Sequence, residues 1–217
     1  MLGRPSKLAI GIVSALIILL ISSYLWALST TGFRIWMAEW NMGRESYSSA
    51  IHWYTRALRQ VDAVKDRELH RQLTGKLYRA YEGICNWDFG SSQPLGWFAG
   101  KDIARLELGQ GLLAIHSQGT NPSLELVRIS LSPLRKYLFQ FRLRCRAGNQ
   151  AQLLWAADTE IFTPDYLKTI PIKAGGEWEE HSVEISPHAG GIGKCRLIPA
   201  NAPGVIELDW IRIKSVE

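Results

Sequence analysis

The chain has 217 residues, 47% of them hydrophobic, and a formal net charge of +5. This length suits one well-packed core with some additional helix, and it is short for two large domains. Residues 1–33 carry +2, residues 34–84 carry nine Lys/Arg against six Asp/Glu, and residues 85–217 carry fourteen of each. A nucleic-acid-binding domain would concentrate positive charge in its folded module, so this distribution argues against one. The N-terminal surplus fits contact with anionic headgroups or a membrane partner, and a solvated helix face explains it equally well.

The first expected element is a transmembrane helix within residues 1–33. Residues 8–28, LAIGIVSALIILLISSYLWAL, contain no charge, and as a helix they would be about 31 Å long, close to the roughly 30 Å of a bilayer core. A cleaved signal peptide is the alternative, because the ALS tripeptide at 27–29 resembles a cleavage site. The apolar run exceeds the roughly 7–15 residues usual in signal peptides, which favours a retained anchor.

Both interpretations place the rest of the chain across the membrane. Arg4 and Lys7 lie close before the apolar run, and clustered positive charge favours the cytoplasmic side. We therefore expect a single-pass protein with its N-terminus inside.

Residues 34–84 have a helical pattern of apolar residues. Within it, Y-x-x-A-I-x-x-Y-x-x-A-L at residues 47–58 resembles the second helix of a tetratricopeptide repeat, with FRIWMAEWNMG before it and LTGKLYRAYEGI after it as neighbouring helices. Such repeats bury their faces only against neighbours, so this short segment must pack on the following domain or on another membrane protein. For the second case, we expect a partner-docking surface made of Tyr47, Ala50, Tyr54 and Ala57.

From residue 85 to residue 217 the apolar period changes to two, as in β-strands. Short alternating runs are separated by turns rich in Gly, Pro, Asn and Ser, and the eight runs are RLEL, LLAIHS, LELVRISL, KYLFQFRLRCR, QLLWAAD, EEHSVEIS, KCRLIPA and GVIELDWIRI. About eight short strands with regular turns predict a mostly β fold, an all-β sandwich of jelly-roll type.

Three segments of this region resemble carbohydrate-binding modules with a galactose-binding-like jelly roll. They are the opening NWDFGSSQPLGWFAG, the strand GGEWEEHSVEI and the closing GVIELDWIRI. The order of helical repeat and sandwich is also similar to the soluble tails of some bacterial O-antigen ligase-like membrane proteins. The resemblance implies a jelly roll that recognises glycans at a bacterial inner membrane, with the C-terminal domain periplasmic or extracellular. Because the shared motifs are mostly structural, they inform the fold more than the ligand.

A sugar site needs aromatic rings for the apolar face of a pyranose and polar groups for its hydroxyls. The candidate rings are Trp97, Trp155, Tyr166 and Trp178, although each ring is also a plausible core residue. Arg142, Arg144 and Arg146 alternate with apolar residues on their strand. We expect them on one outer face, where guanidinium groups suit carboxylated or phosphorylated glycans and a solvated face is the alternative.

The resemblance implies a structural calcium ion, with Asp88 and Asp209 as candidate ligands. The acidic residue that follows the opening Phe in that family is Gly90 here, and calcium prefers six or more oxygens. We therefore expect no cofactor. Cys85, Cys145 and Cys195 show no zinc-binding spacing, and their odd number permits one internal disulfide at most, with Cys145–Cys195 as the candidate pair.

The closing strand contains Glu207 and Asp209 two residues apart, which resembles a catalytic acid pair. Strict alternation cannot bury Leu208 together with Ile211 and Ile213, so we predict a one-residue bulge at Asp209–Trp210. The bulge would turn Asp209 away from the face of Glu207 and toward the opening segment, where it would form hydrogen bonds.

No hydrolase elbow, zinc-protease motif, P-loop or dinucleotide fingerprint occurs in the sequence. The sequence therefore predicts a non-catalytic, membrane-anchored protein with an outward-facing glycan-recognition or positioning module linked to envelope polysaccharide assembly. The alternative is an accessory subunit of a larger membrane complex, in which the helices and the sandwich are protein-docking surfaces.

Overall fold

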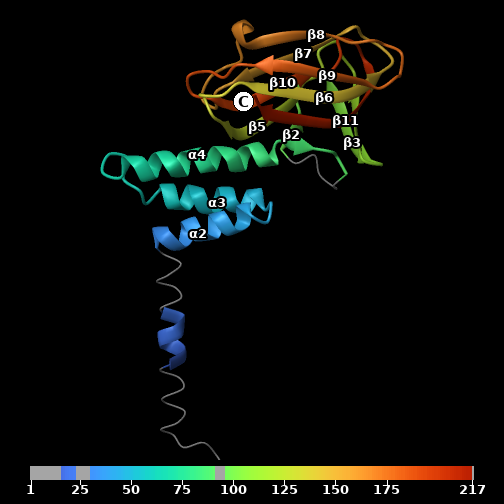
Figure 1. Ribbon diagram of the computed structural model, residues 1–217. Coiled ribbons are helices and arrows are strands. Elements are labelled where there is room, and N and C mark those ends of the chain that lie inside the picture. The colour runs from blue at the N-terminus through green and yellow to red at the C-terminus, as the bar shows by residue number, and fades with distance from the viewer. Residues whose placement is uncertain (1–15, 23–29, 91–95, 217) are drawn as a thin grey trace, which may run out of the picture. The chain divides into compact units, whose positions relative to one another are not determined.

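The computed structural model describes residues 16–22, 30–90 and 96–216. The chain forms two compact units, Met1–Leu77 and Tyr78–Glu217 (Figure 1). The division falls inside helix α4 (Arg67–Ile84), whereas the sequence placed the end of the helical part at residue 84. The reason is that Tyr81 and Ile84, in the last turn of α4, pack against the core of the second unit.

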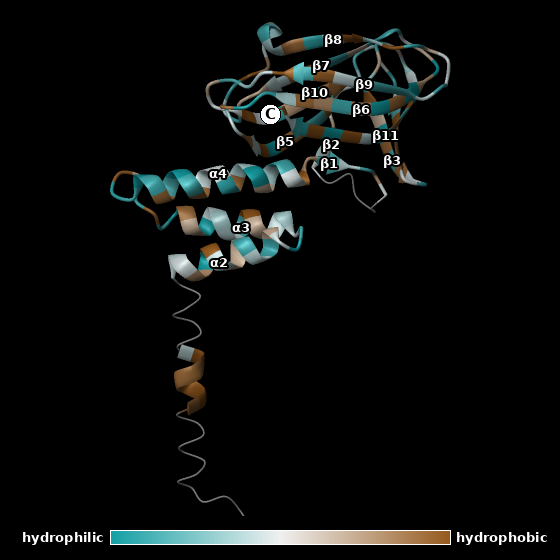
Figure 2. Cartoon of the chain, in the orientation of Figure 1, coloured by the Kyte–Doolittle hydropathy of each residue, from teal (hydrophilic) through white to brown (hydrophobic). Residues whose placement is uncertain are grey.

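Residues 16–22 are helical and expose apolar side chains (Figure 2). Among the described residues, no helix has both the length and the apolar character needed to cross a membrane. The predicted span 8–28 lies largely outside the described residues, so it stays a prediction.

The first unit contains a pair of packed helices, α2 (Thr31–Met42) and α3 (Tyr47–Leu58). Thr30 caps α2, because its side chain accepts a hydrogen bond from the N–H of Phe33. Small alanines on facing sides let the two helices approach closely, and the buried residues include Ala38, Ala50 and Ala57. The helices are therefore present as expected, while their assignment to a tetratricopeptide repeat stays a prediction.

The burial of this helix pair corrects the predicted docking surface. Ala50 and Ala57 are fully buried and Tyr54 is 1% exposed, so these residues lie on the packed side of α3, which contacts α2. Only Tyr47, which is partly exposed, remains accessible to a partner.

The second unit is a sandwich of two antiparallel sheets. The first sheet has the order β3 (Ile103–Gly109), β4 (Leu112–Ser117), β11 (Gly204–Ser215), β6 (Tyr137–Cys145), β9 (Glu179–Ile185), with β1 (Asn86–Trp87) paired to β11. The second sheet has the order β2 (Trp97–Ala99), β5 (Leu124–Leu131), β10 (Ile192–Ile198), β7 (Gln150–Ala156), β8 (Leu167–Pro171). The eight predicted runs all fall in strands, which confirms the predicted sandwich. Strands β1, β2 and β8 and the short helix η1 (Pro164–Tyr166) are additional.

The core lies between the inner faces of the two sheets. Strand β6 alternates strictly, with Tyr137, Phe139, Phe141, Leu143 and Cys145 pointing inward and buried. Its aromatic rings continue into the opening segment: the centroids of Phe139 and Trp97 are 6.4 Å apart. The odd-numbered side chains of β6 therefore belong to the core, and the even-numbered ones must lie on the outer face.

The predicted bulge in β11 is confirmed. The register against β6 shifts between Leu208 and Trp210, and Leu208, Ile211 and Ile213 are all buried. The extra residue is Asp209, and the bulge determines where its side chain points.

Candidate functional site

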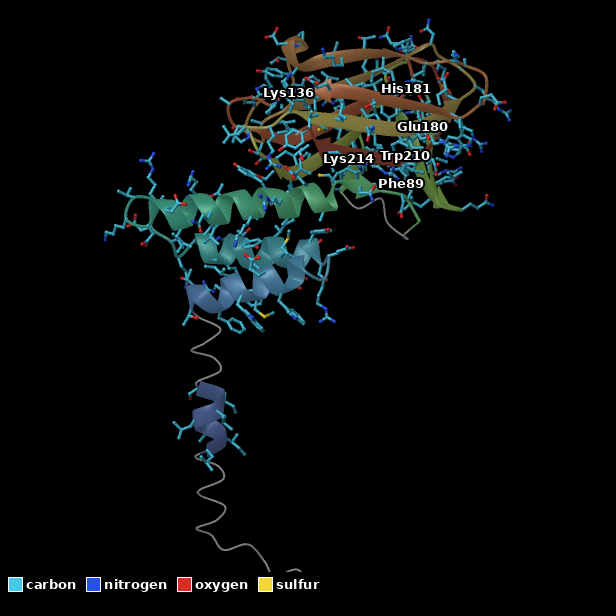
Figure 3. The ribbon with its side chains drawn as sticks, viewed as in Figure 1. Phe89, Lys136, Glu180, His181, Trp210 and Lys214 are labelled. Carbon is cyan, nitrogen blue, oxygen red and sulfur yellow. The ribbon has the colours of Figure 1, made fainter. Side chains whose placement is uncertain are left out.

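Strands β9, β6 and β11 form the outer face on which the predicted arginines lie. Arg142 and Arg144 alternate with Phe141 and Leu143, which are fully buried, so both arginines point away from the core. Figure 3 labels Glu180 on β9 and Trp210 on β11, the two strands that flank β6. The predicted outward direction of these two arginines agrees with the burial pattern.

Both of these arginines have acidic partners on the neighbouring strand β11. Arg142 Nη1 lies 2.9 Å from Asp209 Oδ2, and Arg144 holds Glu207 through two hydrogen bonds, one of them 3.1 Å long. The hydrogen bond from Arg144 lowers the pKa of Glu207, with the charges of Arg144 and Arg146 acting in the same direction. Both carboxylates are therefore ion-pair acceptors in this site.

These contacts correct the expectation for Asp209. The bulge occurs as predicted, yet Asp209 does not turn toward the opening segment, because it bonds to Arg142 on the face that also holds Glu207 and Arg144. The opening segment instead bonds to Arg212, whose Nε donates to Asn86 Oδ1 at 3.0 Å.

Trp178 lies on the guanidinium groups of both arginines. The carbon of the Arg142 guanidinium is 5.3 Å from the ring centroid, and that of Arg144 is 4.7 Å away. These contacts hold one face of the indole against the sheet. The side chain is partly exposed, so part of the ring stays accessible to solvent.

A pocket of about 580 Å³ lies beside these residues. Its lining includes Arg144, Arg146, Glu207 and the glycines Gly176 and Gly204. Both glycines have positive φ angles, 77° and 139°, so side chains there would be strained. Arg146 is exposed and forms no ion pair with any other residue that the structure describes. Among the described lining residues of this pocket, Arg146 is thus the cation without an ion-pair contact.

Two of the predicted platform rings are core residues instead. Trp97 is 1% exposed and Trp155 is 3% exposed, and the indole N–H of Trp155 donates to the carbonyl of Ser186 at 2.7 Å. Tyr166 is partly exposed, but its ring stacks on His188 with centroids 3.4 Å apart. Of the four predicted rings, Trp178 therefore remains as a surface platform.

The outer face of the second sheet carries a further aromatic group that sequence reasoning missed. Phe162 lies against Arg196, with 4.4 Å between the guanidinium carbon and the ring centroid, and Arg196 pairs with Glu125 at 2.8 Å. Phe98 on β2 is a second aromatic ring that sequence reasoning missed, and it is 55% exposed. Alternation in the WFA segment could have identified Phe98 as an exposed residue, because a buried Trp97 forces Phe98 outward.

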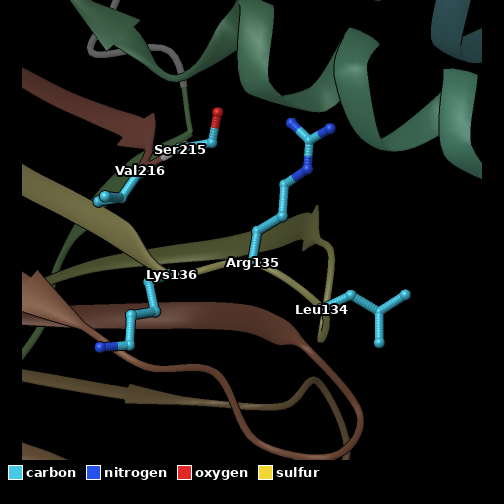
Figure 4. Close-up of a pocket in the computed structure, with 5 residues that line it drawn as sticks. All are labelled: Leu134, Arg135, Lys136, Ser215 and Val216. Carbon is cyan, nitrogen blue, oxygen red and sulfur yellow. The ribbon is translucent and has the colours of Figure 1, made fainter.

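A second pocket, of about 550 Å³, lies at the start of β6 and the end of β11 (Figure 4). The side chains of Arg135 and Lys136 leave this loop in opposite directions (Figure 4). Arg135 lies 3.7 Å from Glu82, and Lys136 lies 2.7 Å from Glu184. Both cations of this pocket already have acidic partners, which makes it a weaker anion site than the pocket beside Arg146.

The two candidate calcium ligands have protein partners. Asp209 binds Arg142, and Asp88 accepts the N–H of Gly90 at 3.2 Å. In the described part of the chain, no group of three or more His, Cys, Asp or Glu side chains is arranged to hold a metal ion.

The three cysteines are free and buried, so the candidate Cys145–Cys195 disulfide is not formed. Burial raises the pKa of the Cys85 thiol to about 12, and it raises the pKa of Cys195 further. Because the thiolate is the reactive form, these thiols are poor nucleophiles.

No protein-family model and no curated protein sequence matches this chain. Among solved structures, the second N-terminal cellulose-binding domain of the Cellulomonas fimi β-1,4-glucanase C is 11% identical, with a TM-score of 0.46 over 62% of this chain and 93% of that one. A family 29 carbohydrate-binding module is 15% identical, with a TM-score of 0.42 over 59% of this chain and 87% of that one. These values are too low to carry an argument about ligand or activity.

Proposed function

We propose that this protein recognises an acidic glycan on the outer face of β9, β6 and β11, and that residues 8–28 hold it at a membrane. The observation that carries the glycan proposal is the combination of Trp178, which is partly exposed, with the adjacent pocket, where Arg146 is exposed and forms no ion pair with any described residue. The apolar run 8–28 is the support for the membrane location.

The geometry suits a sugar with a carboxylate or phosphate group. The apolar face of a pyranose packs on an indole, and its hydroxyls hydrogen bond to polar groups around the ring. The pairs Arg142–Asp209 and Arg144–Glu207 supply both donors and acceptors close to Trp178. Arg146 supplies a planar, permanently charged group that binds carboxylate or phosphate through two parallel hydrogen bonds.

The ion pairs also prepare the site for binding. Each acid holds its arginine in place, and the arginines in turn support the ring of Trp178. A site whose side chains are already ordered loses less conformational entropy when the ligand arrives. The glycan therefore meets a fixed platform and, in Arg146, an exposed cation that forms no ion pair within the described part of the chain.

A glycan array probed with the full-length chain in nanodiscs tests this function. We expect binding to acidic glycans, and for the best ligand we expect Trp178→Ala to weaken affinity by about tenfold or more, because the stacking platform is lost. Arg146→Ala should weaken affinity by about fivefold for the acidic glycan and much less for its neutral analogue.

Phe98→Ala is the matched control, because it removes an exposed aromatic ring from the other sheet. It should leave affinity unchanged. If Phe98→Ala abolishes binding and Trp178→Ala does not, the binding face is the second sheet. If the chain binds no glycan and co-purifies in a fixed ratio with another membrane protein, the docking role replaces glycan recognition.

A further inference from the structure

Helices α2 and α3 carry a continuous aromatic surface. Trp36 and Trp40 lie one turn apart on α2, are 58% and 47% exposed, and stack with centroids 6.4 Å apart. Phe33 extends the row, 5.8 Å from Trp36, and meets Trp53 of α3 edge-on at 6.0 Å. We call these four residues the aromatic surface. Adjacent exposed rings of this size are uncommon on a helix that faces only water, and they mark an interaction site.

Two arginines lie over this surface without acidic partners. The guanidinium carbon of Arg44 is 4.5 Å from the centroid of Trp40, and that of Arg56 is 5.9 Å from the centroid of Trp53. Neither arginine forms an ion pair with any residue in the described ranges. Residues 30–60 contain four arginines and two glutamates, so the surface joins exposed rings to an excess of positive charge.

We infer that the aromatic surface lies in the headgroup layer of a membrane that contains anionic lipid. Tryptophan prefers this layer because its ring is apolar while its N–H needs a polar partner. Arginines close to the surface attract anionic headgroups electrostatically. Exposed rings with positive charge beside them are typical of segments that lie in the plane of the interface.

The position of α2 along the chain supports a lipid partner over a protein partner. The uncharged run ends at residue 28, and α2 begins at Thr31. Three residues of extended chain span about 10 Å at most. If residues 8–28 cross the bilayer, as proposed above, the start of α2 cannot leave the interfacial region. This inference therefore rests on the membrane-anchoring part of the proposed function and is independent of glycan binding.

Fluorine NMR of the full-length chain, labelled with fluorotryptophan, tests the inference. The protein is placed in nanodiscs of phosphatidylcholine and phosphatidylglycerol, with and without a lipid that carries a nitroxide near its headgroup. Trp36→Phe and Trp40→Phe assign the two signals. We expect the nitroxide lipid to broaden both signals at least about twofold more than that of Trp97, the internal control, which is buried in the sandwich core.

Two results would overturn the inference in different ways. If the chain co-elutes with nanodiscs while the Trp36 and Trp40 signals stay as sharp as that of Trp97, the surface is covered by protein or water, and the anchoring proposal survives. If the chain does not co-elute with nanodiscs, the anchoring proposal fails and takes this inference with it. Neither result bears on glycan recognition.

The contribution of Arg44 and Arg56 to the attraction of anionic lipid is tested separately. Replacing phosphatidylglycerol with phosphatidylcholine should reduce the broadening, and the double variant Arg44→Gln/Arg56→Gln should reduce it similarly in the anionic membrane. Lys65→Gln is the matched control, because its side chain is 83% exposed in the same unit and lies outside the aromatic surface. Equal effects of the control and the double variant would show that the two arginines have no special role.

Discussion

The two units of this protein use the same contact, an arginine against a tryptophan, in two different electrostatic settings. On the sandwich, Arg142 and Arg144 support Trp178, and each arginine has an acidic partner on β11. On the helices, Arg44 lies over Trp40 and has no acidic partner among the described residues. The first setting balances its charges internally, while the second leaves positive charge available to an external anion.

This difference separates a preformed site from a surface for adsorption. A ligand that must bind in one orientation needs hydrogen-bond donors and acceptors in fixed positions, which the ion-paired arginines of the sandwich and their acidic partners provide. A fluid layer of headgroups requires no fixed orientation, so unpaired arginines on exposed rings are sufficient. Four variants or conditions break or sharpen this comparison.

The largest expected effect separates core tryptophans from surface tryptophans. Trp97→Ala should lower the free energy of unfolding by about 3–5 kcal/mol, because it leaves a large cavity in the core. Trp178→Ala should lower it by less than about 1 kcal/mol, because that ring is partly exposed. Urea unfolding of the full-length chain, monitored by hydrogen exchange in β6, measures the free energy of unfolding of both variants. A loss of similar size in the two variants would make Trp178 a structural residue and weaken its assignment as a binding platform.

The next effect concerns the bulge in β11. Asp209→Asn should lower folding yield and reduce the free energy of unfolding by about 1 kcal/mol, because Arg142 loses its charged partner at a partly exposed position. The control is Arg44→Gln, which removes an arginine that forms no ion pair with any described residue and should have almost no effect on stability. A hydrolytic activity that Asp209→Asn abolishes while stability stays unchanged would instead make Asp209 a catalytic acid.

A smaller effect is expected from pH. Arg144 holds the pKa of Glu207 below its ordinary value of 4.5, so the folded state binds the Glu207 proton more weakly than the unfolded state does. The resulting stabilisation is present above pH 4.5 and is lost as pH falls through the lowered pKa. Glu207→Gln should remove this part of the acid sensitivity, which thermal melts between neutral and acidic pH would detect. An unchanged acid profile in the variant would mean that the pair contributes nothing to stability.

The smallest effect is expected on the helices. Trp36→Ser/Trp40→Ser should change the free energy of unfolding in detergent by no more than about 0.5 kcal/mol, because both rings are largely exposed. Hydrogen exchange of the backbone amides in α2 and α3 measures this change in stability. Much faster exchange in the double variant would show that the rings hold the helices together, which would weaken their assignment to the headgroup layer.

Much of the sandwich could be predicted because its signals are local. A period of two identifies a half-buried strand from its own residues, and all eight predicted runs are strands. The bulge was predictable for a related reason: Leu208 and Ile211 cannot both face the core without an extra residue between them. The outward direction of Arg142 and Arg144 followed from the same alternation.

The remaining site residues depended on neighbours distant in the sequence. Trp97 and Trp178 are chemically identical, and only the packing of the two sheets buries the first and leaves the second partly exposed. Asp209 meets Arg142 because β11 lies beside β6, a pairing between residues 67 positions apart. Phe162, in the segment between β7 and η1, meets Arg196 of β10, which is also distant in the sequence.

The sequence by itself determined the order of the chain: an uncharged apolar run, a helical segment, and alternating strands with a bulge near the end. These features follow from charge and from the periodicity of neighbouring residues, so they require no knowledge of the fold. Only the tertiary structure decided which of the predicted platform tryptophans lies at the surface, and which arginines have acidic partners among the described residues. Burial and ion pairing depend on strands and helices that the chain brings together from distant positions, and no local pattern specifies those partners.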